Sequence, residues 1–428
     1  MKGNGLNGHG GAGQTRPRRL LLCLDGVPYE VIRAAKGRGL FDAFNTPSNL
    51  LSPFPTLTNV ALAAMFKASA PMGYESLYFD RAERMVRGGV SKYIGRRTPD
   101  KVPSSYMDEL DYQEPLPFEF LIYVAPEAVW RADMRRFHER FRAAPQGRDY
   151  FAFLKGTDGL LHICGRQRLD VALVSLDRIL RDIHAHCGAE TEIVLFSDHG
   201  MNLQENRRAH LQTQLRQGGF EIRDHLRGAG RRSVAAPAFG LCGYAALYCA
   251  DEEAASNVSD ALVPLEGLDF AIHRDGHKAI MVKGARGTAR IQREEMDGQT
   301  LYRYEQVTGD PLLLAEVARS LDDNGLLDRD GYASDKIWFE RTASHVYPDA
   351  LANLYESLHT PRVHHTADVL ASFQDGYYYG SSLFSRFVSI AATHGNALRS
   401  SSTAFLMSTH RTFSEHVRAT EAHPLLKG

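Results

Sequence analysis

The 428-residue sequence has few cysteines, no long hydrophobic run and almost no net charge. Its 5 cysteines include no Cys-x-x-Cys pair, which argues against a thiolate metal site and predicts a reduced, cytoplasmic protein. No apolar segment approaches the ~20 residues that cross a bilayer, so we expect no membrane span. Because 50 basic residues balance 51 acidic ones, a broad nucleic-acid surface is not expected.

The amino-terminal segment lacks the apolar stretch of a secretory signal and is rich in glycine and polar residues. We predict that residues 1–18 are a disordered tail. The hydrophobic content of 43% is sufficient for a sizeable core in the rest of the chain.

Short apolar runs alternate with helical patterns in the first half of the chain. The runs at 20–24, 151–154 and 193–196 read as buried strands, and 166–186 has apolar residues at helical spacing. This order is typical of an α/β fold with a mostly parallel sheet and helices on both faces.

The period of the pattern changes to two between 268 and 305, where Gly-containing turns separate three short runs. We therefore predict a small antiparallel β meander within an inserted α+β subdomain at 266–345. The catalytic core is then expected at 19–265 and 346–428, with 75–115 as a candidate lid.

Acidic and imidazole side chains follow several of the predicted strands. In a parallel sheet the carboxyl ends of the strands lie at one edge, where ligands bind. The residues concerned are three aspartates and three histidines: Asp25, Asp158, His162, Asp198, His199 and His394.

Each of these residues also has a structural explanation. Asp-Gly is a common turn dipeptide, an aspartate after a strand is often a helix cap, and a single histidine is more often structural than a ligand. Together, however, six N and O donors at equivalent places suit two divalent cations. Such a mixed set favours zinc, with manganese or iron as alternatives.

Five stretches of the sequence resemble motifs of the alkaline phosphatase superfamily, in particular its type I phosphodiesterase/nucleotide pyrophosphatase branch. They occur in the family's order and span most of the chain. The stretches are LLLCLDG (20–26), FPTLTN (54–59), TDGLLH (157–162), FSDHGM (196–201) and THGN (393–396).

The resemblance implies a role for each ligand and a nucleophile. One metal would be held by Asp158, His162 and His394, and the other by Asp25, Asp198 and His199 together with the oxygen of Thr58. Thr58 would be the nucleophile, although a threonine before the helical pattern 59–68 could equally be a simple N-cap. The next residue, Asn59, would bind the phosphoryl group, but it lies closer to the threonine than the family's asparagine does.

The expected activity is that of a metal-dependent phosphohydrolase on a small-molecule phosphate ester. The resemblance implies phosphodiester or nucleotide pyrophosphate hydrolysis through a phospho-threonine intermediate. Phosphomonoester hydrolysis and phosphoryl transfer or mutase chemistry would use the same residues. A non-catalytic scaffold remains the alternative from another class, and it predicts that a ligand or the nucleophile is missing.

Overall fold

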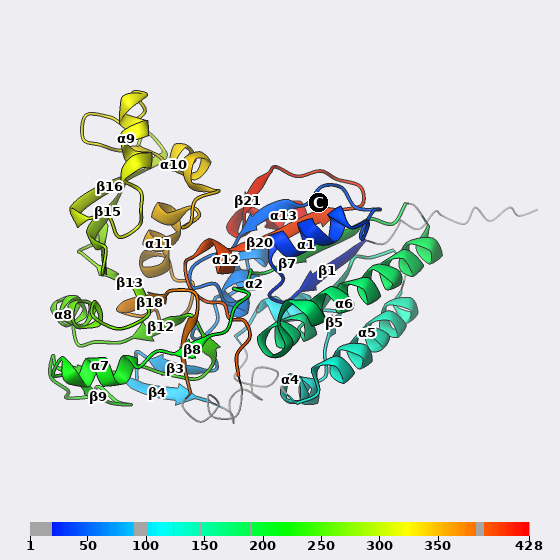
Figure 1. Cartoon of the computed structure of the whole chain (residues 1–428), viewed down its shortest axis with the longest axis horizontal. Helices are drawn as coiled ribbons and strands as arrows, with labels where there is room; N and C mark the ends of the chain where they lie inside the picture. Colours follow the sequence, from blue (N-terminus) through cyan, green and yellow to red (C-terminus); the bar gives the residue numbers. More distant parts are fainter. Residues whose placement is uncertain are drawn as a thin grey trace, which may run out of the picture.

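The computed structural model describes residues 19–89, 102–122, 124–145, 147–188, 190–381 and 389–427. The expected tail at 1–18 and residues 90–101 of the candidate lid lie outside these ranges. Two large sheets lie side by side in the described part of the chain, each with helices packed against it (Figure 1).

The central sheet is mostly parallel, as predicted. β1 pairs in parallel with both β6 and β7, whereas β20 runs antiparallel to its two neighbours. In spatial order its described strands are β21 (His416–Arg418), β2 (Ser48–Leu51), β20 (Thr403–Ser408), β7 (Ile193–Ser197), β1 (Leu20–Leu24), β6 (Tyr150–Leu154) and β5 (Tyr112–Gln113).

Helices cover both faces of this sheet, which explains why its strands are continuous apolar runs rather than alternating ones. Leu20, Leu22 and Leu24 of β1 face one cluster of buried side chains, and Leu21 and Cys23 face another. The first cluster includes α1 (Tyr29–Gly37), α5 (Pro126–Ala143) and α6 (Gly156–Cys187), and the second includes α2 (Thr58–Phe66) and α13 (His423–Lys427).

The second sheet is antiparallel throughout its described pairings. It contains the meander expected near 268–305, and it also takes in β12 and β18, which lie outside the range 266–345. In spatial order it consists of β12 (Tyr244–Leu247), β18 (Val369–Phe373), β13 (Leu268–Arg274), β14 (Ala279–Gly284), β15 (Gly287–Met296), β16 (Gln299–Gly309) and β17 (Ala333–Ser334).

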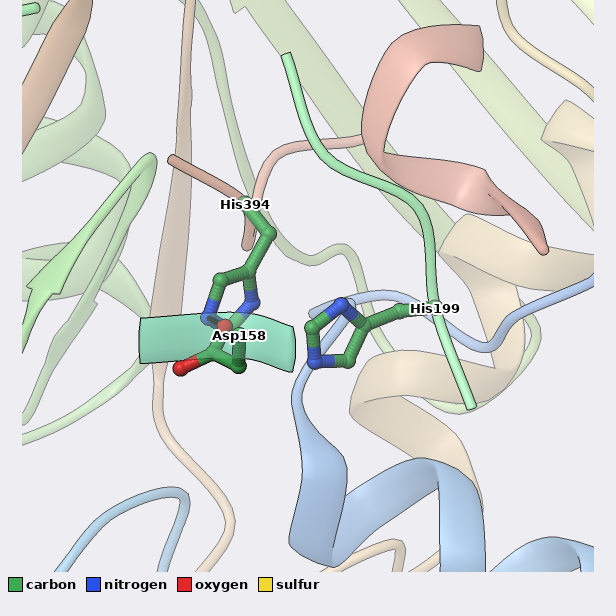
Figure 2. Close-up of side chains that lie close together, drawn as sticks. All are labelled: Asp158, His199 and His394. Carbon is green, nitrogen blue, oxygen red and sulfur yellow. Dashed lines mark ion pairs between the residues drawn. The ribbon is translucent and has the colours of Figure 1, made fainter. Parts of the chain in front are cut away.

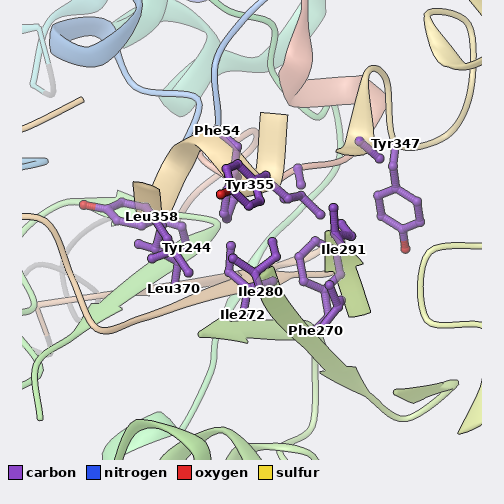
Figure 3. Packing of buried hydrophobic residues seen from close by; sticks show 14 of the residues in the cluster. Phe54, Tyr244, Phe270, Ile272, Ile280, Ile291, Tyr347, Tyr355, Leu358 and Leu370 are labelled. Carbon is purple, nitrogen blue, oxygen red and sulfur yellow. The ribbon is translucent and has the colours of Figure 1, made fainter. Parts of the chain in front are cut away.

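Two helical layers bury the faces of this sheet. On one face lie α7 (Leu211–Gln217) and α8 (Glu252–Leu262), and on the other lie α10 (Asp335–Thr342) and α11 (Ala350–His359). Figure 3 shows the core under α11, where Phe54 packs among residues of the second sheet. The loop that precedes α2 is thus anchored in the second sheet's core.

None of the helices in the described ranges is long and apolar enough to cross a membrane.

Candidate metal and phosphoryl-transfer site

Three parallel strands of the central sheet end at the same level. Leu24 at the end of β1 pairs with Leu154 of β6 and with Ser197 of β7. The residues that follow therefore emerge side by side: Asp25 after β1, and Asp198 directly after β7. The third aspartate, Asp158, lies in the first turn of α6, which begins two residues after β6, and all three of these side chains are buried.

The three histidines reach this edge from different segments. His199 follows Asp198, His162 lies one helical turn after Asp158, and His394 comes from the segment between 389 and α12 (Arg399–Ser402). The His199 and His394 rings stack with centroids 3.9 Å apart and planes 13° apart. Figure 2 shows these two rings beside the carboxylate of Asp158.

The six side chains bring possible ligand atoms close together. One atom from each of Asp158, His199 and His394 lies within 4.8 Å of the other two, and the same holds for Asp25, Asp198 and His199. His162 belongs to neither of these tight groups, but its Nε2 lies 3.2 Å from Asp158 Oδ1. His199 is thus shared between the groups, and all six predicted ligands meet in one place.

Each histidine binds a backbone carbonyl through its Nδ1. The acceptors are the carbonyl oxygens of Ala392 for His162, at 2.7 Å, of Gly200 for His199, at 2.9 Å, and of Thr56 for His394, at 2.8 Å. A carbonyl oxygen accepts, so each Nδ1 carries the proton. In a neutral ring the Nε2 lone pair is then directed at the carboxylates, which is the arrangement that metal-ligating histidines show.

The carboxylates leave acceptor atoms unsatisfied. Within the described ranges Asp25 Oδ2, Asp158 Oδ1 and Asp198 Oδ2 are buried and accept no hydrogen bond. Burial, and next the charge of Asp198, raise the pKa of Asp25 well above its ordinary value. Three buried carboxylates with free lone pairs are costly unless a positive charge lies among them.

The imidazoles respond to the same environment in two ways. Burial lowers the pKa of His199 to about 4 and that of His394 to about 3, so both rings are in the neutral form that a metal ion requires. Burial also opposes the charged form of His162, but the adjacent Asp158 outweighs it and raises the pKa of His162. The neutral rings of His199 and His394, together with the orphaned carboxylate oxygens, form a donor set that fits divalent cations.

Gly26 allows these side chains to approach one another. Its φ of +70° is unfavourable for other residues, and an added Cβ would lie 3.1 Å from Asp158 Oδ1. Its backbone N–H donates to Asp198 Oδ1 at 3.1 Å, so the turn after β1 also orients the carboxylate after β7.

Thr58 is the first residue of α2 and faces the same cluster. Its Oγ1 lies 3.2 Å from Asp25 Oδ1 and 3.3 Å from His199 Nε2. The alternative that Thr58 is the N-cap is wrong: Leu57 occupies that position, and no side chain caps the helix. The hydroxyl is therefore directed at the carboxylate and imidazole instead of at the backbone of its own helix.

Two residues close to Thr58 in the sequence, Thr56 and Asn59, make other contacts. Thr56 Oγ1 donates to the carbonyl oxygen of Asn396 at 3.1 Å and accepts from the N–H of Gly395 at 2.9 Å, so it holds the segment that carries His394. Asn59 lies half-buried in the first turn of α2, where its Oδ1 accepts from the Tyr106 hydroxyl at 2.8 Å.

Comparison with known proteins gives a result at the level of structure only. No protein-family model matches the chain, and no curated protein matches it in sequence. The phosphonoacetate hydrolase from Sinorhizobium meliloti 1021, solved with phosphonoformate, is 11% identical with a TM-score of 0.52, over 96% of this chain and 95% of that one. The chain has an alkaline-phosphatase-like fold. The human ectonucleotide pyrophosphatase/phosphodiesterase 5 is 12% identical with a TM-score of 0.48, over 96% and 93% of the two chains.

Sequence analysis missed the groups that orient the six predicted ligands. Thr157 Oγ1 donates to the backbone oxygen of Asp25 at 2.6 Å, and Ser197 Oγ accepts from the N–H of Val27 at 2.9 Å. Thr157 and Ser197 each precede a predicted ligand directly, and this adjacency was the only signal in the sequence. The carbonyl acceptors of the histidines carry no sequence signal, because every residue has such a group.

Proposed function

We propose that the chain is a metal-dependent phosphohydrolase that uses Thr58 as its nucleophile. The observation that carries this proposal is the orientation of the three histidines, whose Nε2 atoms are directed at three carboxylates while each Nδ1 is bound to a carbonyl. In the proposed assignment, one divalent ion is held by Asp158, His162 and His394. The other is held by Asp25, Asp198 and His199 together with Thr58, and zinc is the favoured metal.

The ions would supply two things when bound: a lowered pKa for the threonine hydroxyl and neutralisation of charge on the phosphoryl group. The proton of Thr58 Oγ1 has two acceptors in reach, Asp25 Oδ1 and His199 Nε2. Thr58 also begins a helix, whose first backbone N–H groups and dipole favour an anionic phosphoryl group. Asn59, in the same turn, is proposed as an additional donor to that group.

The reaction proposed has two displacements at phosphorus. In the first, Thr58 Oγ1 forms a bond to phosphorus, and the bond between phosphorus and the leaving group breaks. The leaving group departs with the electron pair of that bond. In the second, water attacks the phospho-threonine, which releases phosphate or a phosphate monoester and returns the proton to the hydroxyl. Phosphodiesters, including nucleotide pyrophosphates, are the proposed substrates ahead of phosphomonoesters.

The test is a substrate panel on three forms of the protein. The substrates are p-nitrophenyl phosphate, the p-nitrophenyl ester of thymidine monophosphate, p-nitrophenyl phenylphosphonate and phosphonoacetate. Each is assayed with metal-loaded wild type, Thr58→Ala and Thr58→Ser. We expect the diester to be preferred, Thr58→Ala to lose at least about 10³-fold in kcat with metal content unchanged, and Thr58→Ser to retain part of the rate.

Other outcomes reject specific parts of the proposal. Full activity of Thr58→Ala would mean that water or another hydroxyl attacks. Inactivity of the metal-loaded wild type on all four compounds would contradict hydrolysis of simple esters. A preference for phosphonoacetate would replace the ester with a C–P bond as the substrate group.

A further inference from the structure

A cavity with charged and apolar lining lies between the two sheets, beside α2 and apart from the ligand cluster. Its volume is about 490 Å³, within the usual range for small-molecule sites. None of the six predicted metal ligands lines it, and neither does Thr58. Its walls come from β2, α2, β15, β16, α11 and β21.

Charged side chains of both signs line this cavity, but the carboxylates are already paired. Asp335 and Asp349 are each bound by two nitrogens of Arg418, at distances of 2.5 to 2.8 Å. Glu356 Oε1 lies 3.4 Å from Arg293 Nη1 and accepts from the Tyr302 hydroxyl at 3.2 Å. The acidic residues therefore offer little attraction for a cationic ligand.

Two cations of the cavity, by contrast, lack an ion-pair partner in the described part of the chain, although the charges of Glu356 and Asp349 act on Arg362 from beyond ion-pairing distance. Within the described ranges, neither Arg362 nor Lys67 forms an ion pair. Arg362 Nη1 donates to Phe54 O at 2.5 Å and to Asn353 Oδ1 at 2.9 Å, whereas its Nε and Nη2 have no such bond to any described residue. Burial lowers the pKa of Arg362 to about 10, so the fold bears a cost for holding this charge.

The rest of the lining is largely apolar. Leu51, Val60, Ala63 and Ala352 line the cavity together with Tyr302. A ligand that matches this lining needs an anionic group for the guanidinium and ammonium and an apolar body for the walls.

We propose that this cavity binds a small organic anion, a carboxylate or a phosphate ester with an apolar body, with Arg362 and Lys67 as its charged contacts. The proposal does not depend on hydrolysis at Thr58, because the cavity contains none of that machinery. The proposed ligand would nevertheless lie close to the loop that leads to Thr58, because Arg362 donates a hydrogen bond to the carbonyl oxygen of Phe54 in that loop.

Isothermal titration calorimetry of the full-length protein tests the proposal. A chelator is present, so that no metal ion at the six predicted ligands can bind the probe anions. The probes are phenyl phosphate and benzoate, with benzyl alcohol as a neutral control. We expect one or both anions to bind and the alcohol not to bind. Binding of benzoate identifies the carboxylate source of the anion, and binding of phenyl phosphate identifies the phosphate source.

Four variants locate the site. Arg362→Gln should weaken binding at least tenfold and Lys67→Gln at least threefold, while Thr58→Ala and the exposed Lys336→Gln should bind as wild type does. Lys67 is exposed at the end of α2, so Lys67→Gln decides the matter even if Arg362→Gln fails to fold. Absence of binding, binding that is insensitive to Lys67→Gln, or binding lost in Thr58→Ala would each overturn the proposal.

Discussion

At the scale of single residues, buried histidines have two kinds of surroundings in this chain. Three lie among carboxylates at the end of the central sheet, whereas His273 lies in β13 of the second sheet with no carboxylate within ion-pairing distance in the described ranges. Its Nδ1 has no hydrogen-bond partner there. Burial, and next the charge of Lys283, lower the pKa of His273 to about 4.

This environment predicts a loss of stability in mild acid. The unfolded chain, with an ordinary histidine pKa of about 6.5, binds more protons than the folded chain once the pH falls below that value. Between pH 7 and pH 5, wild type should lose about 2 kcal/mol more unfolding free energy than His273→Gln. Urea unfolding of both proteins at the two pH values, with chelator present, measures this difference. Equal losses of unfolding free energy in the two proteins would contradict the conclusion that His273 is buried in its neutral form.

At the scale of elements, the short first segment of α6 positions Asp158 and His162. Gly165, with φ +65° and ψ −165°, separates this segment from the longer helix behind it. Gly159 lies against Ile122, the residue after α4 (Leu116–Leu121), because an added Cβ would come within 2.1 Å of Ile122 Cγ1. The shape of this segment therefore depends on the absence of a side chain at 159.

Gly159→Ala should consequently destabilise the protein by about 1–3 kcal/mol through overpacking. Ile122→Ala removes the methylene that would clash with the added Cβ. In the Ile122→Ala background, Gly159→Ala should therefore cost less unfolding free energy than it does in wild type. Unfolding free energies of the four proteins form the cycle that tests this. Additive effects would show that the two residues do not contact each other.

Sequence predicted the elements of the site better than its details. The strands before Asp25 and Asp198 were predictable, since short continuous apolar runs bounded by turn residues are typical of buried strands in a parallel sheet. The cap at α2 was not, because Thr58 is a better N-cap than Leu57 by intrinsic preference, yet its hydroxyl contacts Asp25 and His199 instead. His162 contacts Asp158 without joining either tight group, and its role as a ligand stays a prediction.

At the scale of the whole molecule, the full strand composition of the second sheet could not be predicted from the sequence. β12 and β18 join the second sheet from chain positions more than 100 residues apart, and local patterns carry no information on such pairing. The same holds for the cavity beside α2, whose unpaired cations become visible only when α11 and β21 are placed.

Arg418 gives the clearest prediction at this scale. From β21 of the central sheet it binds both Asp335 and the buried Asp349, which belong to the helices of the second sheet. Arg418→Met leaves Asp349 as a buried, unpaired charge and should cost about 3–5 kcal/mol.

Adding Asp349→Asn to Arg418→Met removes that charge and should recover part of the loss. Chemical unfolding of the two variants and of wild type, all with the same metal content, gives the comparison. A loss below about 1 kcal/mol for Arg418→Met would mean that the pair contributes no more than an exposed one does.

The central claim is that six side chains from four segments of the chain hold divalent cations beside Thr58. Anomalous diffraction from crystals of the zinc-loaded, catalytically active protein tests it most directly. We predict two anomalous peaks, one among Asp158, His162 and His394 and one among Asp25, Asp198 and His199. An active protein with no peak among these residues would contradict the account.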